Sequence, residues 1–403
     1  MTSPGPYLHR ELQAKRELGT TAVRPAAAAL FSGFFLGLLL AVPALQLALD
    51  RSFPSLPQGL DRGSLHQFET TLEEQSWVVA DLLPQVQQVL TSLLGQGNLQ
   101  VYVGRDGWLF LRPGVDALTG PGFLDPAVLE LRRRGGEGWT VPVQPDPRPA
   151  FAALHETLAA RGIELVLLPV PDKAAIHPEK LARRAVEAPL GNPSRPELAR
   201  WLDEQGIGLF DPAPLLAAPA AAPRYLATDT HWTPEALDRV ARALARDLAP
   251  LLVHGPRAGW HEREEEVSGQ GDLARMLELP PGSPLHPEQT VTVKRVLAGD
   301  GSPWRPEPRA EVLLLGDSFT NVFSREDLGW GTGAGLAERL SFHLGRPVDR
   351  IAVNAGGAHA SREALARDLA SGRDRLAGKR VVVYEFADRE LAVGDWRVLG
   401  DTR

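Results

Sequence analysis

Short apolar runs that alternate with stretches of helical periodicity constrain the fold of this chain more than any other feature. The predicted strands are Glu164–Val170, Gly208–Phe210, Glu311–Leu315, Arg350–Val353 and Arg380–Phe386, and the predicted helices are Pro149–Arg161, Pro234–Leu248, Gly335–Leu344 and Ser361–Ser371. Runs such as Val-Leu-Leu-Leu and Val-Val-Val-Tyr are apolar at every position, as expected for strands that are covered on both faces. The order predicts an α/β domain whose mainly parallel sheet is flanked by helices.

An uncharged segment from Ala26 to Leu49 precedes this domain. At about 1.5 Å per residue it would form a helix roughly 36 Å long, enough to cross a hydrocarbon core of about 30 Å. Four basic residues come before it, namely Arg10, Lys15, Arg16 and Arg24. This bias predicts a cytoplasmic N-terminus, a single membrane span, and a periplasmic or extracytoplasmic position for everything after Asp50. A buried core helix and a cleaved signal peptide are the alternatives, and the long polar lead disfavours cleavage.

The chain therefore divides into four predicted parts: a cytoplasmic tail (1–25), a transmembrane helix (26–49), a helical stalk or lead-in (50–98) and the α/β domain (99–403). The stalk is predicted because apolar residues recur at approximately helical spacing from Phe68 to Leu83. The α/β domain is expected to begin with a hairpin made of Val101–Val103 and Trp108–Leu111. The stretch Asp125–Arg148, rich in Pro, Gly and Arg, is interpreted as a surface insertion.

Composition excludes several classes of function. The 403 residues include 43 basic and 50 acidic side chains, a formal net charge of −7, without a basic stripe, so a nucleic-acid partner is not expected. The absence of cysteine excludes thiolate metal sites, disulfides and cysteine nucleophiles. The glycine string Gly329–Gly335 is not interpreted as a phosphate loop, because no strand precedes it and no Lys-Ser/Thr follows.

The sharpest chemical signal is Gly316-Asp317-Ser318 directly after a buried strand. In an open α/β sheet, ligands bind at the carboxyl ends of the strands. Gly316 permits a sharp turn that presents Ser318 as a nucleophile, and the N–H of Ser318 can face a developing oxyanion. A plain turn is the alternative.

The second signal is Asp229-Thr-His231-Trp232, followed by a helix start at Thr233-Pro234. A serine nucleophile needs a base and the base needs an orienting carboxylate. Asp229 and His231, two apart in an extended segment, can project to the same side. A local turn hydrogen bond and a metal ligand are the alternatives; metal is disfavoured because no second histidine has ligand spacing and no acidic cluster accompanies the motif.

Together these motifs resemble the SGNH hydrolase-like domain of the alginate O-acetyltransferase family, the AlgJ and AlgX type, in which Asp-x-His precedes the nucleophilic serine. Further matching stretches are Gly104–Phe110, Pro171–Leu181, Gly271–Leu277 and Glu385–Leu391. The resemblance extends over about residues 60–396. It implies an SGNH hydrolase-like sheet with a permuted motif order, preceded by one transmembrane helix.

The resemblance also implies roles for individual residues. Ser318, His231 and Asp229 would form the triad, without metal or cofactor. Asn354, Gly356 and Gly357, just after a strand, would supply the second oxyanion element, although an ordinary strand-to-helix loop is equally consistent with them. Trp232 is expected either to stack on a sugar ring or to lie in the core. Lys173, just past a strand end, is expected either to face an anionic saccharide or acetyl carrier or to be solvated.

The predicted function is transfer of acetyl, through an acetyl-serine, to hydroxyls of an exported, alginate-like polysaccharide. The resemblance implies a membrane-bound O-acyltransferase partner that supplies the acetyl group. The alternatives are a polysaccharide O-acetylesterase, which uses the same triad with water, and a non-catalytic scaffold of an export complex. The sequence identifies neither the polymer nor the acetyl donor.

Overall fold

The computed structural model describes residues 24–48, 55, 59, 61–134, 143–183, 189–253 and 258–399. The chain forms two compact units, Met1–Leu83 and Pro84–Arg403, which are described separately. All but the end of the predicted cytoplasmic tail lies outside the described residues.

The first unit contains α2 (Pro25–Ala48), α3 (Arg62–Glu74) and the π-helical turn η1 (Val78–Leu82). Within the described ranges, α2 is the single helix long and apolar enough to cross a membrane, over Pro25–Gln46. It carries no acidic side chain in its first turn and no basic one in its last. Its length and composition are those of the predicted span.

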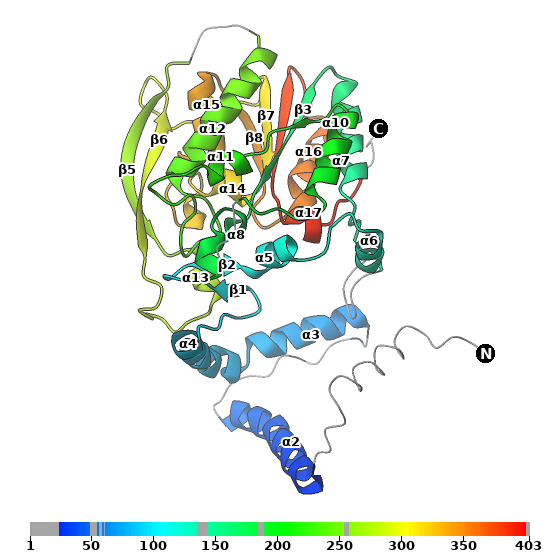
Figure 1. Cartoon of the computed structure of the whole chain (residues 1–403), viewed down its shortest axis with the longest axis vertical. Helices are drawn as coiled ribbons and strands as arrows, with labels where there is room; N and C mark the ends of the chain where they lie inside the picture. Colours follow the sequence, from blue (N-terminus) through cyan, green and yellow to red (C-terminus); the bar gives the residue numbers. More distant parts are fainter. Residues whose placement is uncertain are drawn as a thin grey trace, which may run out of the picture. The chain divides into compact units, whose positions relative to one another are not determined.

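The second unit is built on a five-stranded sheet in the order β4-β3-β9-β7-β8 (Figure 1). All four neighbouring pairs are parallel. The strands are β3 (Glu164–Val170), β4 (Gly208–Leu209), β7 (Val312–Gly316), β8 (Asp349–Ala352) and β9 (Val381–Ala387). The predicted parallel α/β sheet is therefore confirmed, and each boundary lies within one residue of its prediction.

Helices cover both faces of this sheet, which explains why its central strands are apolar throughout. Val312 and Leu314 of β7 point into a core shared with α12 (Pro234–Leu248) and α15 (Leu336–Leu344). Leu313 and Leu315 point the other way, into a core shared with α7 (Arg148–Ala159), α10 (Arg195–Glu204) and α16 (Ala360–Ala370). Figure 1 shows these two layers on opposite sides of the strands.

The predicted hairpin is also present. Strands β1 (Val101–Val103) and β2 (Leu109–Leu111) are antiparallel, with Val103 opposite Leu109. Asp106 and Gly107 close the turn with φ of 54° and 79°, a backbone region that Asp tolerates and Gly favours.

The remaining helices are short, apart from α4 (Leu83–Leu94), which begins at the unit boundary. The others are α5 (Arg112–Thr119), α8 (Lys173–Ile176), α9 (Pro178–Leu181), α11 (Ala213–Ala217), α13 (Asp272–Met276), α14 (Ser318–Asn321), α17 (Glu390–Val393) and the 3₁₀ turns Ala249–Leu251, Glu326–Leu328 and Gly357–His359.

One pair of strands was not predicted. Strands β5 (His261–Gly269) and β6 (Gln289–Leu297) form an antiparallel two-stranded arm, which α12 and α15 separate from the main sheet (Figure 1). β5 reads His-Glu-Arg-Glu-Glu-Glu-Val, and most of its side chains are exposed, so it lacks the apolar pattern from which strands are predicted.

The interpretation of Asp125–Arg148 as a surface insertion is partly wrong. Its first part forms α6 (Pro126–Arg133), in which Leu129 is buried and Asp125 caps the start by accepting a hydrogen bond from the N–H of Ala127. The guanidinium of Arg132 donates to the carbonyl oxygen of Gly394 at 2.6 Å. This part of the stretch is therefore joined to the domain; residues 135–142 lie outside the described residues.

Candidate active site

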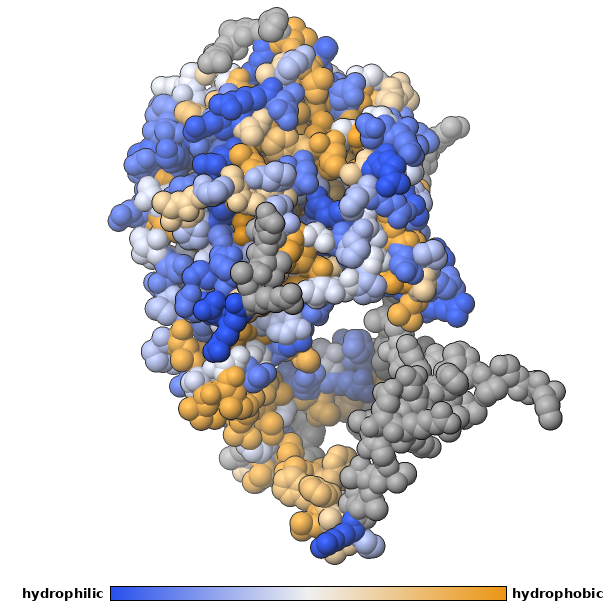
Figure 2. Space-filling model, viewed as in Figure 1, coloured by the Kyte–Doolittle hydropathy of each residue, from blue (hydrophilic) through white to orange (hydrophobic). Residues whose placement is uncertain are grey.

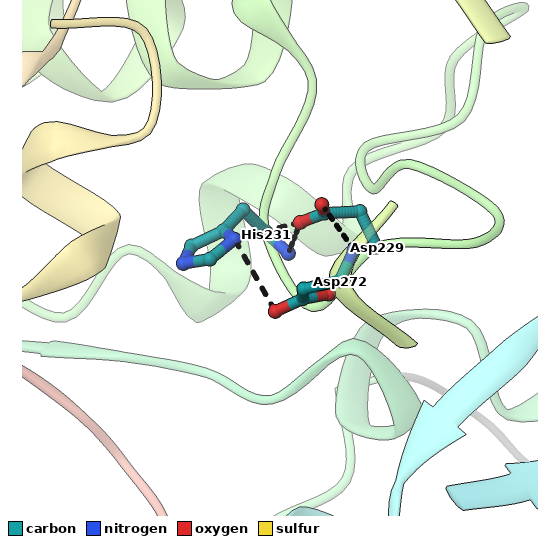
Figure 3. A group of neighbouring side chains, drawn as sticks. All are labelled: Asp229, His231 and Asp272. Atoms are coloured by element: carbon teal, nitrogen blue, oxygen red, sulfur yellow. Dashed lines mark hydrogen bonds and ion pairs between the residues drawn. The ribbon is translucent and has the colours of Figure 1, made fainter. Parts of the chain in front are cut away.

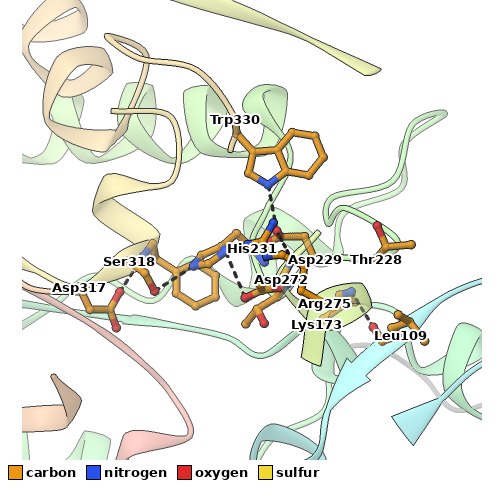
Figure 4. Close-up of polar contacts among 12 residues, drawn as sticks. Leu109, Lys173, Thr228, Asp229, His231, Asp272, Arg275, Asp317, Ser318 and Trp330 are labelled. Carbon is orange, nitrogen blue, oxygen red and sulfur yellow. Dashed lines mark hydrogen bonds and ion pairs between the residues drawn. The ribbon is translucent and has the colours of Figure 1, made fainter. Parts of the chain in front are cut away.

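Ser318 lies where β7 turns into α14, at the carboxyl end of the sheet (Figure 4). The carboxylate of Asp317 caps the turn, because its Oδ1 accepts a hydrogen bond from the N–H of Phe319 at 2.7 Å. A Cβ at Gly316 would collide with Oγ1 of Thr320 and lie 2.7 Å from a carboxylate oxygen of Glu385. Only glycine fits there, so the predicted sharp turn is present.

The Asp229–His231 segment is a tight bend, so the predicted extended backbone is wrong. The N–H of His231 donates to Oδ1 of Asp229 at 2.9 Å, the local turn hydrogen bond weighed as an alternative. An antiparallel bridge between Tyr225 and Trp232 closes the bend. Thr233 then caps α12, as predicted, by accepting from the N–H of Ala236.

The bend places His231 between the other two candidate residues (Figure 4). Its Nε2 lies 2.9 Å from Oγ of Ser318, and its Nδ1 lies 2.6 Å from Oδ1 of Asp229. Asp229 and His231 are both buried. With Asp229 ionised, Nδ1–H donates to the carboxylate and Nε2 accepts from the serine hydroxyl, the arrangement of a nucleophile–base–acid relay.

Four N–H groups converge on the Asp229 carboxylate. Besides the two of His231, the backbone N–H of Asp272 and the indole Nε1–H of Trp330 donate to Oδ2, each at 2.9 Å. Burial alone would raise the pKa of Asp229, but the imidazole and these donors outweigh it and hold the pKa well below its usual range. The same pairing raises the pKa of His231 against the opposing effect of its burial.

Trp330 was not identified from the sequence, although it lies inside the glycine string. Gly329 and Gly331 flank it with φ of 83° and 78°, and the indole is fully buried. An isolated tryptophan in a glycine-rich loop was the only available signal. Its partner lies 101 residues away in the chain, so the contact was not readable from local pattern.

Asp272 is a second carboxylate beside the imidazole (Figure 3). Its Oδ2 lies 3.9 Å from Nδ1 of His231, and its Oδ1 accepts from the N–H of Thr230 at 2.7 Å. Burial and the neighbouring Asp229 charge raise the pKa of Asp272. A Cβ on the preceding residue, Gly271, would collide with the carbonyl oxygen of Thr228, so glycine is required for this approach.

Asp229, His231 and Asp272 also lie close enough together to be considered as metal ligands, with candidate atoms within 4.8 Å of one another. The sequence had offered no such acidic cluster, because Asp272 is distant in the chain. However, four N–H donors already point at Asp229, and their positive ends would repel a cation. The donor set therefore fits a hydrogen-bonded relay better than a metal centre.

A buried glutamate, Glu385, accepts hydrogen bonds from the turn that carries Ser318. Oε2 of Glu385 accepts from the N–H of Asp317 at 3.0 Å and from the hydroxyl of Thr320 at 2.7 Å. Burial, together with the nearby Asp317 carboxylate, raises the pKa of Glu385 well above its usual value. Glu385 belongs to a stretch that resembles the family, but the sequence assigned it no role.

The loop after β8 lies beside the nucleophile turn. Gly316 pairs with Ala352 in the sheet, so Ser318 and Asn354 each lie two residues beyond a paired position. Oδ1 of Asn354 accepts from the side-chain amide of Asn321 at 2.8 Å, which joins this loop to α14. Ala355 and Gly357 both have positive φ, 53° and 64°, and consecutive N–H groups in such backbone can form an anion-binding concavity.

The expectation that Trp232 stacks on a sugar ring is wrong, and the core alternative is confirmed. Its side chain is fully buried and packs edge-on against Phe319, with ring centroids 5.4 Å apart. Phe319 is equally buried. Both rings lie in the core beneath the relay, because the bend and α14 cover them.

Both expectations for Lys173 are also wrong. Its side chain is buried, and its ammonium donates to the carbonyl oxygens of Leu109 and Ala227 at 2.6 and 3.1 Å (Figure 4). Burial lowers the pKa of Lys173 to about 7. The residue therefore joins β2 to the bend that carries His231, and does not present a charge on an open face.

Comparison with known protein families gives a match over most of this unit. The family model described as "SGNH hydrolase-like domain, acetyltransferase AlgX" matches residues 136–388, more than half of the chain. The matched range contains the whole five-stranded sheet and every residue of the relay.

Two curated relatives are similar over nearly their whole length. "Probable alginate O-acetylase AlgJ" of Pseudomonas putida is 27% identical over 377 residues, which cover 90% of this chain and 89% of that protein. The protein of the same name from Pseudomonas fluorescens is 28% identical over 391 residues, covering 91% and 88%. Among solved structures, the "O-Acetyltransferase Domain of Pseudomonas putida AlgJ" is similar with a TM-score of 0.55 and 23% identity, covering 73% of this chain and 93% of that one, which shows a shared fold.

Proposed function

The chain belongs to the SGNH hydrolase-like acetyltransferase family of AlgX, and we propose that it transfers acetyl groups to hydroxyls of an exported, alginate-like polysaccharide through an acetyl-serine at Ser318. The observation that carries the proposal is the continuous contact from Asp229 through His231 to Ser318. The acceptor class is supported by the relatives, which are named as alginate O-acetylases.

The first half-reaction forms the acetyl-serine. Nε2 of His231 takes the hydroxyl proton as Oγ of Ser318 attacks the acetyl carbonyl of the donor. The bond between carbonyl carbon and leaving group then breaks, and the imidazolium returns the proton to that leaving group. Asp229 holds Nδ1–H in place and stabilises the imidazolium while the proton is on Nε2.

The second half-reaction uses the same groups in reverse. A sugar hydroxyl gives its proton to His231 and attacks the acetyl carbonyl, and the proton then passes to Oγ of Ser318 as the serine leaves. The product is an acetylated sugar and a regenerated serine. No external oxidant, metal or nucleotide is needed for either step.

The developing oxyanion needs N–H donors close to Ser318. The N–H of Ser318 is at the first residue of α14, where a helix leaves N–H groups without an intrahelical partner. The loop Asn354–Gly357 adds backbone N–H groups, and its contact with Asn321 supports a position beside the same carbonyl. The left-handed φ of Ala355 is uncommon for a residue with a side chain, which supports a functional role for this loop.

The proposed setting is the outer face of the bacterial inner membrane. Helix α2 meets the requirements of an anchor, and the catalytic unit follows it in the chain. We place a membrane-bound O-acyltransferase as the partner that delivers acetyl from the cytoplasmic side, because an extracytoplasmic enzyme has no access to cytoplasmic acetyl carriers. An esterase, with water as acceptor, is the second candidate, since the relay alone does not select the acceptor.

The experiment that tests the proposal is trapping of the intermediate. The full chain is incubated with an activated acetyl ester, and the acetylated residue is located by mass spectrometry, with and without oligosaccharides. Acetyl on Ser318 that disappears when acetylated sugar forms supports transfer. Ser302→Ala, which alters an exposed loop serine, is the matched control. A chain that still transfers acetyl as Ser318→Ala, or that yields only acetate with every oligosaccharide, contradicts the proposal.

A further inference from the structure

Helix α4 buries two polar side chains and exposes an apolar stripe. Gln87 and Thr91 are each only 7% exposed, whereas Val86, Val89 and Leu93 are 42%, 54% and 76% exposed. These three follow one another at three- and four-residue intervals, so they form one stripe along the helix. A soluble domain buries the apolar face of such a helix, and α4 does the opposite.

Hydrogen bonds fix this orientation. The side-chain amide of Gln87 donates to the hydroxyl of Thr91 at 3.0 Å and to the carbonyl oxygens of Gln96 and Gly97, each at 3.2 Å. The hydroxyl of Thr91 donates to the same Gln96 oxygen at 2.9 Å. Rolling the helix to bury its apolar stripe would expose Gln87 and leave these carbonyl groups without donors, so the hydrogen bonds oppose that rotation.

The loop that follows α4 ties it to the catalytic unit. The side-chain amide of Asn98 donates to the carbonyl oxygen of Met276 in α13 at 2.7 Å, and Arg112 donates twice to the carbonyl oxygen of Asn98. The helix is therefore held on the domain by its polar side, and its apolar stripe is presented to the surroundings.

The exposed surface is apolar and uncharged. Leu94 and Leu99 extend the stripe, and both are exposed. Figure 2 shows hydrophobic residues gathered where Figure 1 places α4. No charged residue occurs from Leu82 to Gly104. A contiguous apolar patch of this kind marks a contact site, and the lack of charge argues against a polyanionic or charged peptide partner.

With α2 as the proposed membrane anchor, contacts in the first unit place the residues just before α4 near the membrane. The amide of Gln46, at the end of α2, donates to the carbonyl oxygen of Gln75 at 2.8 Å and accepts from the N–H of Trp77 at 3.0 Å. The indole of Trp77 donates to the carbonyl oxygen of Val42 at 3.3 Å. Tryptophan is enriched at the membrane–water boundary, so these contacts put Trp77 at the outer end of the span.

Chain length then limits where α4 can begin. Leu83 follows Trp77 by six residues, which reach about 20 Å when fully extended. Whatever the arrangement of the two units, the start of α4 is therefore close to the bilayer surface. We propose that α4 is a monotopic membrane-contact helix whose Val86, Val89 and Leu93 enter the outer-facing leaflet of the lipid bilayer in which α2 is anchored. The inference does not depend on acetyl transfer.

The absence of cysteine allows a direct test. Leu93→Cys and Ser92→Cys are each made in the full chain, because the two adjacent residues are exposed but lie on different sides of α4. Each is labelled with an environment-sensitive fluorophore and reconstituted in liposomes of phosphatidylethanolamine and phosphatidylglycerol. Emission is measured with a nitroxide on the lipid chains and with aqueous iodide, at two ratios of protein to lipid.

The expected result is a blue-shifted probe at position 93 that lipid nitroxide quenches several-fold more than iodide does, and the reverse at position 92. Equal quenching by iodide at both positions would show a free surface and overturn the proposal. A probe at position 93 shielded from both quenchers would show that a protein covers the helix, and this also overturns it. Shielding that is lost on dilution in lipid would identify that protein as a second copy of the chain.

Discussion

The indole Nε1–H of Trp330 donates a hydrogen bond of 2.9 Å to Oδ2 of Asp229, across 101 residues of sequence. The other oxygen of the same carboxylate is 2.6 Å from Nδ1 of His231. Trp330 therefore fixes the orientation of the acid through the oxygen that the imidazole does not use, and it does so from a loop with no direct contact to the reacting serine.

Removing this donor should reduce activity without unfolding the chain. Trp330→Phe keeps most of the buried ring but leaves Oδ2 of Asp229 with one donor fewer. Because a hydrogen bond to a charged group contributes about 1.5–3 kcal/mol, a loss of activity of roughly tenfold or more is expected. Trp304→Phe is the matched control, since within the described chain the buried Nε1 of Trp304 has no hydrogen-bond partner. Equal effects of the two variants on acetyl transfer would argue against the orienting role.

Ser318→Ala and His231→Ala should each abolish acetyl transfer, by on the order of a thousandfold or more. The double variant should be no worse than either single one, because members of a relay act as a unit. Single-turnover assays with an activated acetyl ester measure this, and thermal unfolding checks that the fold survives. If the two losses multiplied, the residues would be acting independently.

The pH dependence should follow His231. Its pKa is raised because the attraction of Asp229, with smaller contributions from Asp272 and Asp317, outweighs its burial. The base must be neutral to accept the serine proton, so activity should fall as the pH drops through a value above the ordinary 6.5 of histidine.

Asp229→Asn should shift this limb of the profile to lower pH while lowering the plateau on the order of a thousandfold, because the charge and the correct tautomer are both lost. Asp300→Asn, in an exposed loop, should leave the profile unchanged. A profile of Asp229→Asn identical in midpoint to that of the wild type would contradict the coupling.

Glu385 should behave as a buried neutral acid. Its folded-state pKa lies well above 4.5, so the unfolded chain ionises first and stability is lost as the pH rises above the unfolded-state value. Glu385→Gln cannot ionise and can still accept from Asp317 and Thr320. Its stability relative to the wild type should therefore increase from pH 4 to 7, and Glu326→Gln, at an exposed position, is the matched control.

Glu385→Ala leaves both donors unsatisfied and should cost about 1–3 kcal/mol for each. Urea unfolding across the pH range measures these differences. A Glu385→Gln variant that becomes progressively less stable than the wild type with rising pH would show that the carboxyl is ionised in the fold.

Local pattern was sufficient to predict the sheet. β3 and α12 lie at their predicted bounds because an apolar run and a Thr-Pro cap are encoded in neighbouring residues. The arm β5–β6 was missed because most side chains of β5 are charged and exposed, so its pairing with β6, and not burial, makes β5 a strand.

The relay could be located because Ser318 follows a buried apolar strand and His231 comes just before a recognisable helix start. The residues that support the relay could not be predicted, because Trp330, Asp272 and Glu385 meet their partners only after the chain has folded. Burial was the other limit. Tryptophan is rarely buried completely and lysine almost never, so only the packing of the domain shows that Trp232 and Lys173 are both enclosed.

Two of the four donors to Asp229 are next to the β5–β6 arm: Asp272 lies in the connection between its two strands, and Trp330 lies in the loop against which Gly269 packs. In a chain that has formed its sheet but not this arm, only two of the four N–H donors to Asp229 are in place. Ser318 is then weakly reactive. Covalent labelling of Ser318 by an activated ester is thus a readout of folding as well as of catalysis.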